Sequence, residues 1–165
     1  MELLIFSDSH GDISRMRAAF VRQVRRPDAV IFLGDGLRDV ESLDWDPAIL
    51  YSVAGNCDWF ADGVRTEIVM ALEGHTLLMT HGHLYGVKGG YGPLLKHAAE
   101  VGADIVLCGH THLPCEETIP AGTQLGNVIL ERPMYLLNPG SIGKGGSFGT
   151  LSLQKDRVLP AHGSV

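Results

Sequence analysis

The sequence predicts an α/β domain with a mixed β-sheet, and three observations support this fold class. Apolar runs and helical segments alternate in the first third of the chain, which gives the order βαβαβ of a parallel sheet. Glu73-Gly74-His75 separates two strand-like runs and is a hairpin signal, which predicts an antiparallel pair. Beyond Pro114 the signals are those of short strands, and that half is expected to be antiparallel β.

The first strand is expected over residues 3–6, and Asp12 or Ser14 can cap the helix that follows it. This helix is expected to reach about Arg26, where Pro27 ends it. The apolar residues that give it a core face at helical spacing are Ile13, Met16, Phe20, Val21 and Val24. The runs 29–33 and 49–53 then read as strands, with a short helix after Gly36 between them.

The hairpin strands are expected over 66–72 and 76–80, and Gly92-Pro93 opens a helix that ends near Gly102. A further buried strand is expected over 105–108. The later short strands are predicted at 117–119, 134–137, 150–154 and 157–160. The glycine-rich stretch 143–149 is expected to be a mobile loop.

Length and charge narrow the class of protein. The 165 residues are expected to form one domain, 1–165. A formal net charge of −6 argues against an extended basic surface for nucleic acid, although it leaves room for a small phosphate ester held by metal ions. The apolar runs are too short for a membrane span, and the start of the chain lacks the features of a signal peptide. With three cysteines and no CxxC pair, we expect a cytoplasmic protein.

Five short polar clusters each follow an apolar run that reads as a buried strand. They are Asp8-Ser-His10, Gly34-Asp35-Gly36, Gly55-Asn56-Cys57-Asp58, His81-Gly-His83 and Gly109-His110-Thr-His112. Loops that leave the carboxyl ends of strands in an α/β sheet converge on one crevice. The sequence therefore predicts a metal centre, for which the candidate catalytic and metal-binding residues are Asp8, His10, Asp35, Asn56, His81, His110 and His112.

Seven candidate ligands are more than one ion needs. Asp8 and His10 alternate around Ser9, so both side chains can point the same way from an extended segment, and the same holds for His110 and His112. Asp35 lies between glycines and can offer both carboxylate oxygens, which would let it bridge two ions. Two ions that share this residue would have four ligands each.

The charge balance of such a centre suits phosphoester hydrolysis. Two divalent ions with two carboxylates leave a charge of about +2, which a bound hydroxide reduces to about +1, and this favours a phosphate ester anion. Metal-bound water also provides a hydroxide nucleophile near neutral pH. Oxygen and imidazole ligands without thiolate indicate manganese, iron, zinc, nickel or cobalt.

The ordered motifs resemble the signature of the calcineurin-like metallophosphoesterases over residues 3–141. Within that superfamily, the segments Leu4–His10, Gly55–Asp58, Thr80–His83, Gly109–His112 and Asn138–Ser141 look like the small branch that includes the YfcE-type phosphodiesterases and is related to Vps29. The resemblance implies a four-layer αββα sandwich of two mixed sheets between helices, a manganese-dependent phosphodiesterase activity, and a homo-oligomer such as a dimer or tetramer. It assigns one ion to Asp8, His10, Asp35 and His112, and the other to Asp35, Asn56, His81 and His110.

Cys57 departs from the superfamily, in which many members have histidine after the Gly-Asn pair to contact phosphate or protonate the leaving group. A thiol is a weak general acid, so we expect a preference for good leaving groups or protonation by water. Asp58 could orient His81 or His83 through a hydrogen bond to its ring. His83 could contact substrate or make a structural hydrogen bond. Trp59 and Phe60 could form a pocket wall or a protein interface.

Two alternative functions compete with a phosphoesterase. An inactive scaffold of the Vps29 kind would keep the fold and bind proteins, but the retention of all seven ligands argues against it. A metallo-β-lactamase-like hydrolase would need an HxHxDH motif, which the segment 81–85 lacks. Among the residues outside the centre, Asp12 is expected to be a helix cap, Cys108 and Cys115 buried thiols, and His75, His97 and His162 surface residues.

Overall fold

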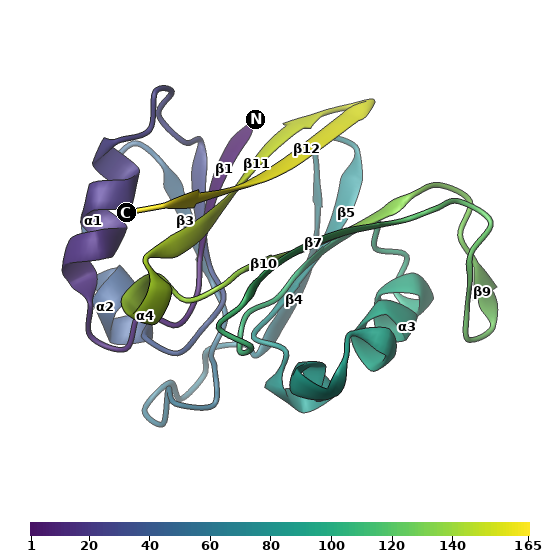
Figure 1. Ribbon diagram of the computed structural model, residues 1–165, viewed down its shortest axis with the longest axis horizontal. Helices are drawn as coiled ribbons and strands as arrows, with labels where there is room; N and C mark the ends of the chain where they lie inside the picture. The colour runs from purple at the N-terminus through teal and green to yellow at the C-terminus, as the bar shows by residue number, and fades with distance from the viewer.

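Two five-stranded mixed β-sheets form the centre of the protein in the computed structural model, which describes residues 1–165 (Figure 1). The first sheet has the order β12 (Arg157–Ser164), β11 (Ser147–Gln154), β1 (Glu2–Phe6), β2 (Ala29–Phe32) and β3 (Ile49–Ser52). Strands β1, β2 and β3 run parallel, while β11 pairs antiparallel with both β1 and β12. The parallel half is the predicted βαβαβ unit.

The second sheet has the order β4 (Glu67–Leu72), β5 (His75–Thr80), β6 (Ile105–Leu107), β10 (Met134–Pro139) and β7 (Pro114–Ile119). Strands β4 and β5 form the predicted antiparallel hairpin. Strand β10 pairs parallel with β6, so the expectation of a purely antiparallel second half is wrong on that side and right for its pairing with β7. Each sheet therefore contains three adjacent parallel strands.

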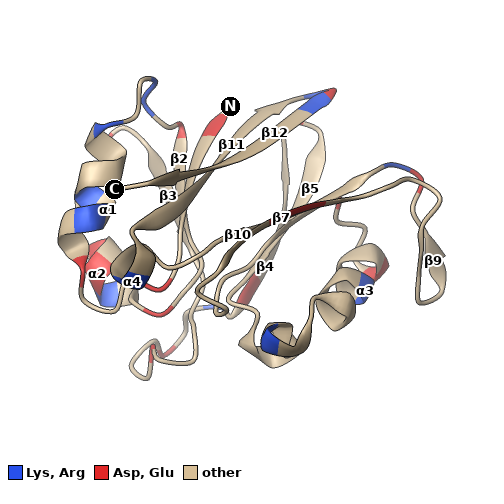
Figure 2. Cartoon of the chain, in the orientation of Figure 1, with Lys and Arg blue, Asp and Glu red and all other residues tan.

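Helices cover the outer face of each sheet. Helices α1 (Ile13–Val21) and α2 (Leu37–Glu41) lie against the first sheet, and α3 (Gly92–Glu100) lies against the second, preceded by the 3₁₀ turns His83–Tyr85 and Val87–Gly89 (Figure 1). A short ribbon of β8 (Gln124–Leu125) and β9 (Val128–Ile129) contacts α3. Figure 2 shows the Lys and Arg residues scattered over the helices and strand ends.

The alternation of side chains along each strand creates the layers. In β1, Leu3 and Ile5 are buried between the two sheets, whereas Leu4 and Phe6 pack toward α1 and α2. In β6, Val106 packs toward α3 while its two neighbours face the first sheet. The four-layer αββα sandwich is thereby confirmed. No helix is long and apolar enough to cross a bilayer.

Helix α1 is shorter than the sequence predicts. Asp12 caps it as expected, accepting a hydrogen bond from the Arg15 N–H, but the helix ends at Val21 instead of near Arg26. Val21 and Val24 are 73% and 103% exposed, so their assignment to the core face is wrong. Pro27 disfavours helical geometry in the residue before it, so the helix cannot continue to Arg26.

The glycine-rich stretch 143–149 is ordered, contrary to expectation. It forms helix α4 (Ile142–Gly145) and the start of β11. The Ser141 hydroxyl caps α4 by accepting from the Lys144 N–H, and Gly146 ends it with φ of 68°. Gly143 is required because a Cβ there would lie 2.1 Å from the Ser9 carbonyl oxygen. These glycines permit close packing instead of mobility.

Of the three histidines expected on the surface, His162 is exposed as predicted, His97 is half-buried and His75 is buried, and all three have structural contacts. His75 is buried, with Nδ1 2.8 Å from Asp104 Oδ2, and the latter atom also lies 3.2 Å from Arg132. His97 bonds to Glu67 at 3.0 Å, and His162 lies 2.8 Å from the Asn138 carbonyl oxygen. Their partners are more than 20 residues away, so local sequence could not show them. Cys108 is buried as expected, and Cys115 is half-buried.

The matched pair Val24 and Val30 tests where the core ends. Val30 in β2 is fully buried, so Val30→Ala should lower the free energy of unfolding by about 2 kcal/mol through lost apolar burial and a small cavity. Val24→Ala should change it by less than about 0.5 kcal/mol, because that side chain contacts solvent. Urea unfolding monitored by circular dichroism measures both, and equal midpoints for the two variants would contradict the burial described.

Candidate metal centre

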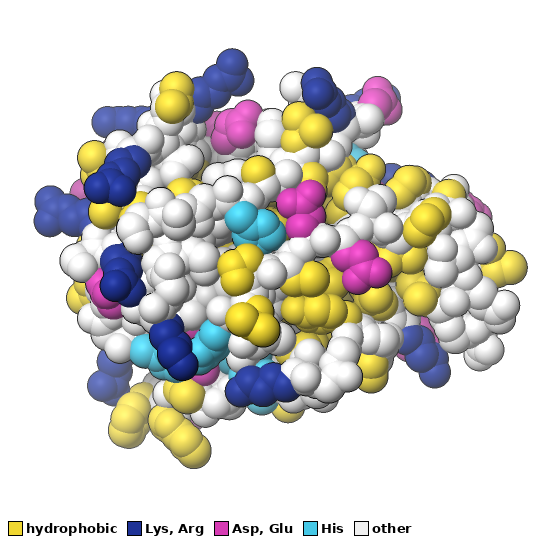
Figure 3. All heavy atoms as spheres, in the orientation of Figure 1, with side chains coloured by type: hydrophobic (Ala, Val, Ile, Leu, Met, Phe, Trp, Pro, Cys, Tyr) yellow, Lys and Arg dark blue, Asp and Glu magenta, His cyan; other side chains and the backbone are white.

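The candidate ligands lie at one edge of the sandwich, where the parallel strands of both sheets end. Asp8, Asp35 and Asn56 follow β1, β2 and β3, whereas His81 and His110 follow β5 and β6. Figure 3 shows histidine side chains gathered near the lower edge of the molecular face that it presents. Convergence of these loops is what the sequence predicts from two sets of parallel strands.

The first group consists of Asp8, His10 and His112, whose ligand atoms all lie within 4.8 Å of one another. Asp8 Oδ1 is 3.0 Å from His112 Nε2 and 3.8 Å from His10 Nε2, and the two Nε2 atoms are 3.4 Å apart. Although Asp8 Oδ1 is buried, it has no hydrogen-bond partner. A buried carboxylate oxygen without a donor is costly unless a cation binds it, so this group fits a metal ion.

The second group consists of Asp35, His81 and His110. His81 Nε2 lies 3.3 Å from Asp35 Oδ2 and 3.1 Å from His110 Nδ1. Two ligands about 2.1 Å from one ion are about 3.0 Å apart in octahedral and about 3.4 Å apart in tetrahedral geometry. Most of the distances in both groups are close to these values. His10 and Asp35 also share a group with Cys57, which places the two clusters side by side.

Five of the candidate ligands have a left-handed backbone. The φ angles are 57° for Asp8, 46° for His10, 60° for Asp35, 68° for His110 and 62° for His112. This conformation is uncommon outside glycine and clusters at functional sites. The sequence predicts that each pair, Asp8 with His10 and His110 with His112, projects from an extended segment. The backbone there is not extended, so this part of the prediction is wrong. Tight turns bring these pairs together.

Asp58 positions Asp35 and does not hold His81 or His83, contrary to one sequence-based alternative. Its carboxylate accepts hydrogen bonds from the backbone N–H groups of Asp35, Gly36, Leu37 and Gly55, at 2.7 to 3.0 Å. Asp35 Oδ1 in turn accepts from the Cys57 N–H at 2.7 Å. The loops after β2 and β3 are thereby locked together. His81 is oriented by the Leu33 carbonyl oxygen, which lies 2.7 Å from its Nδ1.

Asn138 and Ser141 support the first group, a role that the motif alone did not reveal. The Asn138 amide donates to the Gly109 carbonyl and the Thr111 hydroxyl at 2.8 and 3.0 Å, which fixes the turn carrying the two histidines. The Ser141 hydroxyl donates to the Asp8 carbonyl oxygen. Gly109 is needed because a Cβ there would lie 1.9 Å from the Ser7 hydroxyl. The position of Asn138 at the end of a parallel strand is the sequence signal for this support.

The electrostatics of the second group match an ion pair. Burial alone would lower the pKa of His81, but the carboxylates of Asp35 and Asp8 outweigh burial and raise it. Burial likewise opposes the charge on Asp35, yet hydrogen bonds from His81 and Cys57 lower the pKa of that carboxyl. The pKa of His110 falls to about 4 because of burial and the nearby His81 and Lys88. A neutral His110 is ready to bind metal at pH 7.

The remaining predicted site residues differ in placement. Asn56 is exposed, its amide nitrogen lies 3.3 Å from Cys57 Sγ, and its assignment to the second ion stays a prediction. The His83 ring lies 5.4 Å from that of His81, and its buried Nδ1 has no partner. Partial burial and the carboxylates of Asp35 and Asp58 raise the pKa of the exposed Cys57 thiol. A neutral thiol is a poor nucleophile.

The four backbone hydrogen bonds of Asp58 give a test of its positioning role. Asp58→Asn should lower the free energy of unfolding by about 3 kcal/mol, because an amide nitrogen would face backbone N–H groups and leave them unsatisfied. Urea unfolding measures this, with the exposed Asp156→Asn as the matched control. Equal stabilities of the two variants would show that the carboxylate does not organise these loops.

Comparisons with known proteins agree with this geometry. Residues 1–156 match the calcineurin-like phosphoesterase superfamily domain. The chain is 30% identical over 161 residues to the probable metallophosphoesterase YsnB of Bacillus subtilis, which covers 94% of this chain and 86% of the relative. It is 27% identical over 186 residues to the phosphodiesterase YfcE of Escherichia coli, with 96% and 90% coverage.

Solved structures share the fold. A predicted phosphoesterase from Streptococcus pneumoniae superposes with a TM-score of 0.73 at 26% identity, covering 99% of this chain and 88% of that chain. Zinc-bound Vps29 from Entamoeba histolytica superposes with a TM-score of 0.70 at 20% identity and 99% coverage of each chain. The motif order, the paired histidine and carboxylate groups and the match over nearly the whole chain together show that this protein belongs to the calcineurin-like phosphoesterase superfamily.

Proposed function

We propose that this member of the superfamily is a dinuclear metal-dependent phosphodiesterase. The observation that carries the proposal is the unpartnered Asp8 Oδ1, which lies 3.0 Å from His112 Nε2 beside a second group of the same chemistry. Membership of the superfamily supports a phosphoesterase that uses metal, and the name of the relative YfcE favours diesters as substrates.

The residues would divide between two ions that share Asp35. Asp8, His10 and His112 would bind the first ion, and His81 and His110 the second. Asn56 would complete the second site after a rotation of its exposed side chain away from Cys57. Asp35 is suited to a shared position, because its turn is fixed by Asp58 and its Oδ2 faces His81.

The chemistry follows from this donor set. When bound, the divalent ions supply positive charge for the phosphoryl oxygens and a hydroxide nucleophile for in-line attack. The oxygen and imidazole donors suit manganese, which is our first choice of metal. The protein holds the ligands in turns that Asp58 and Asn138 brace, so little reorganisation is needed on metal binding. The cytoplasmic location and a homo-oligomeric state stay predictions.

A Vps29-like scaffold is the alternative function, and one observation favours it. Large apolar side chains next to the ligand loops are solvent-exposed, with Trp59 81% and Leu113 70% exposed, as protein interfaces require. A scaffold has no need for turnover. No uptake of divalent metal at stoichiometric levels, together with no hydrolysis of bis-p-nitrophenyl phosphate under manganese, would favour this alternative.

Metal titration tests the dinuclear centre. Calorimetry with manganese should show two bound ions per chain, and Asp35→Asn should abolish at least one of them because the shared ligand loses its charge. Hydrolysis of bis-p-nitrophenyl phosphate should fall by about 100-fold or more in this variant. Asp44→Asn, an exposed aspartate outside the centre, is the matched control for both measurements. Full activity of Asp35→Asn would refute the shared position.

Cys57→His tests protonation of the leaving group. A histidine next to Asn56 can donate a proton near neutral pH, so it should raise the rate for alkyl diesters relative to p-nitrophenyl diesters by about 10-fold or more. Cys57→Ser, which adds no acid in that pH range, serves as the control. Identical relative rates across the panel for Cys57→His and the native protein would show that position 57 takes no part in leaving-group departure.

A further inference from the structure

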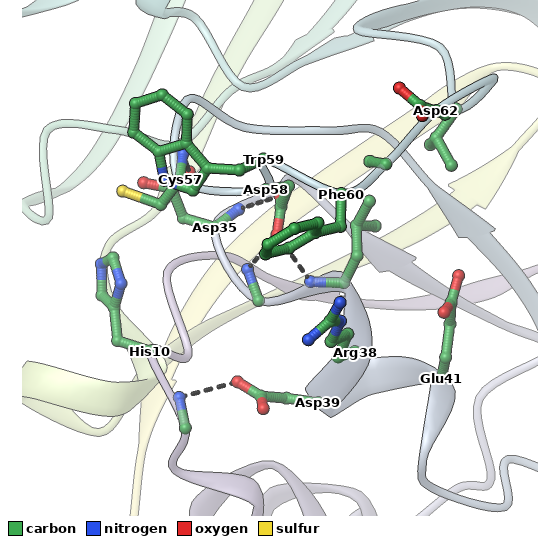
Figure 4. A pocket seen from close by; sticks show the side chains of 15 residues that line it. His10, Asp35, Arg38, Asp39, Glu41, Cys57, Asp58, Trp59, Phe60 and Asp62 are labelled. Atoms are coloured by element: carbon green, nitrogen blue, oxygen red, sulfur yellow. Dashed lines mark hydrogen bonds between the residues drawn. The ribbon is translucent and has the colours of Figure 1, made fainter.

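A cavity of about 430 Å³ opens beside His10 and Asp35 and extends from the metal centre along α2. Its volume lies within the range of ~300–1,000 Å³ in which small-molecule sites fall. Figure 4 shows Trp59 and Phe60 on one wall of this cavity, near Cys57 and Asp35. A phosphoester bound at the metal ligands would therefore project one of its substituents into this space.

Arg38 is the one Lys or Arg side chain that lines the cavity. Its guanidinium carbon lies 4.6 Å from the centroid of the Phe60 ring, and the side chain makes no ion pair or hydrogen bond within the protein. Two carboxylates of the cavity are already occupied, Asp58 by four backbone N–H groups and Asp39 by Ser9 and Gly11. Glu41, three residues further along α2, forms no ion pair with Arg38. The planar donors of Arg38 are thus available to a phosphate of a ligand.

Trp59 offers a flat apolar face that the fold does not use. It is 81% exposed, whereas Trp45, the other tryptophan, is 5% exposed and packs against Phe6 and Phe20. Exposed aromatic rings beside a phosphate-binding site are suited to stacking with nucleobases, which all present a π face. Trp59 therefore supplies a stacking surface where Arg38 supplies charge.

Two carboxylates lie at the end of the cavity away from His10. Glu41 and Asp62 line it there and have no ion pair or hydrogen bond within the protein (Figure 4). Free carboxylate oxygens accept hydrogen bonds from hydroxyl and amino groups, such as those of a sugar or a base. The cavity thus combines a stacking surface, a free cation and free acceptors next to the metal ligands.

We propose that this cavity binds the nucleoside part of a nucleotide phosphodiester that carries a phosphate besides the scissile one. The scissile phosphoryl group lies at the metal centre, the base stacks on Trp59, and the additional phosphate pairs with Arg38. A nucleotide has all three complementary features in one small molecule. This inference rests on the proposed phosphodiesterase function and names its substrate class.

Three substrates with the same p-nitrophenol leaving group test it. They are methyl p-nitrophenyl phosphate, thymidine 5′-(p-nitrophenyl phosphate), and the latter compound with a 3′-phosphate. The first has neither base nor second anion, the second adds the base, and the third adds the anion. Because the leaving group is constant, differences in kcat/KM report on the cavity. We expect kcat/KM to rise at each addition in the manganese-loaded protein.

Each variant should reduce one of the two increases in kcat/KM along that series. Trp59→Ala should lower the ratio of the thymidine to the methyl substrate by about 10-fold, while Trp59→Phe keeps most of it. Arg38→Gln should lower the ratio of the 3′-phosphorylated to the unphosphorylated nucleotide by about 10-fold, while Arg38→Lys keeps part of it. Arg25→Gln, an exposed arginine outside the cavity, is the control and should change neither ratio.

Binding to the metal-free protein separates this inference from the proposed function. Thymidine 3′,5′-bisphosphate should bind in calorimetry, and both Trp59→Ala and Arg38→Gln should weaken it at least about fivefold. Turnover of all three substrates with unchanged ratios in the variants overturns the nucleotide site and leaves the phosphodiesterase standing. Absence of turnover with variant-sensitive binding overturns the enzyme and keeps the site. Absence of both overturns both.

Discussion

Packing of the two sheets against each other is the interaction on which the rest of the molecule depends. Leu3 and Ile5 of one sheet and Leu77, Ile105 and Leu107 of the other belong to a single buried cluster between them. Because three parallel strands of each sheet end at the same edge, this apolar contact brings carboxylates from the first sheet and histidines from the second within a few ångströms of each other. Neither sheet alone carries a complete set of ligands.

The two groups of candidate metal ligands lie in turns whose backbone has a left-handed conformation, which few residues other than glycine adopt. Asp8, Asp35 and His110 adopt left-handed φ angles, and the glycines next to Asp35 and His110 allow the loops to touch. Such turns are costly in isolation and persist only when their surroundings fix them. Asp58 supplies this constraint for the loops of the first sheet and Asn138 for the histidine turn of the second. Stability of the fold and geometry of the centre are therefore coupled.

The cavity along α2 lies next to the candidate metal ligands and could determine which substrate is bound. In the proposed function the metal centre contacts the phosphoryl group, which every phosphoester shares, so selectivity would come from side chains that the chemistry does not require. Arg38 and Trp59 fit that description, since neither contributes to the buried core and both face the cavity. Arg38 lies in α2 just after Asp35, and Trp59 lies just after Cys57, which links the proposed substrate choice to the part of the centre where this chain departs from its superfamily.

The sequence by itself determined the fold class, most strand positions and the candidate ligands, because apolar periodicity and motif order are local properties. It was wrong for Val24, the 143–149 segment, His75 and the role of Asp58. His75, Asp58 and Gly143 depend on partners distant in sequence, such as Asp104 for His75, whereas Val24 lies in solvent beyond the end of α1. The tertiary structure alone decided which ligands face one another, turned the amide nitrogen of Asn56 toward Cys57, and placed Arg38 over Phe60. The physical reason is that side-chain distances and burial arise only when separate strands pack together.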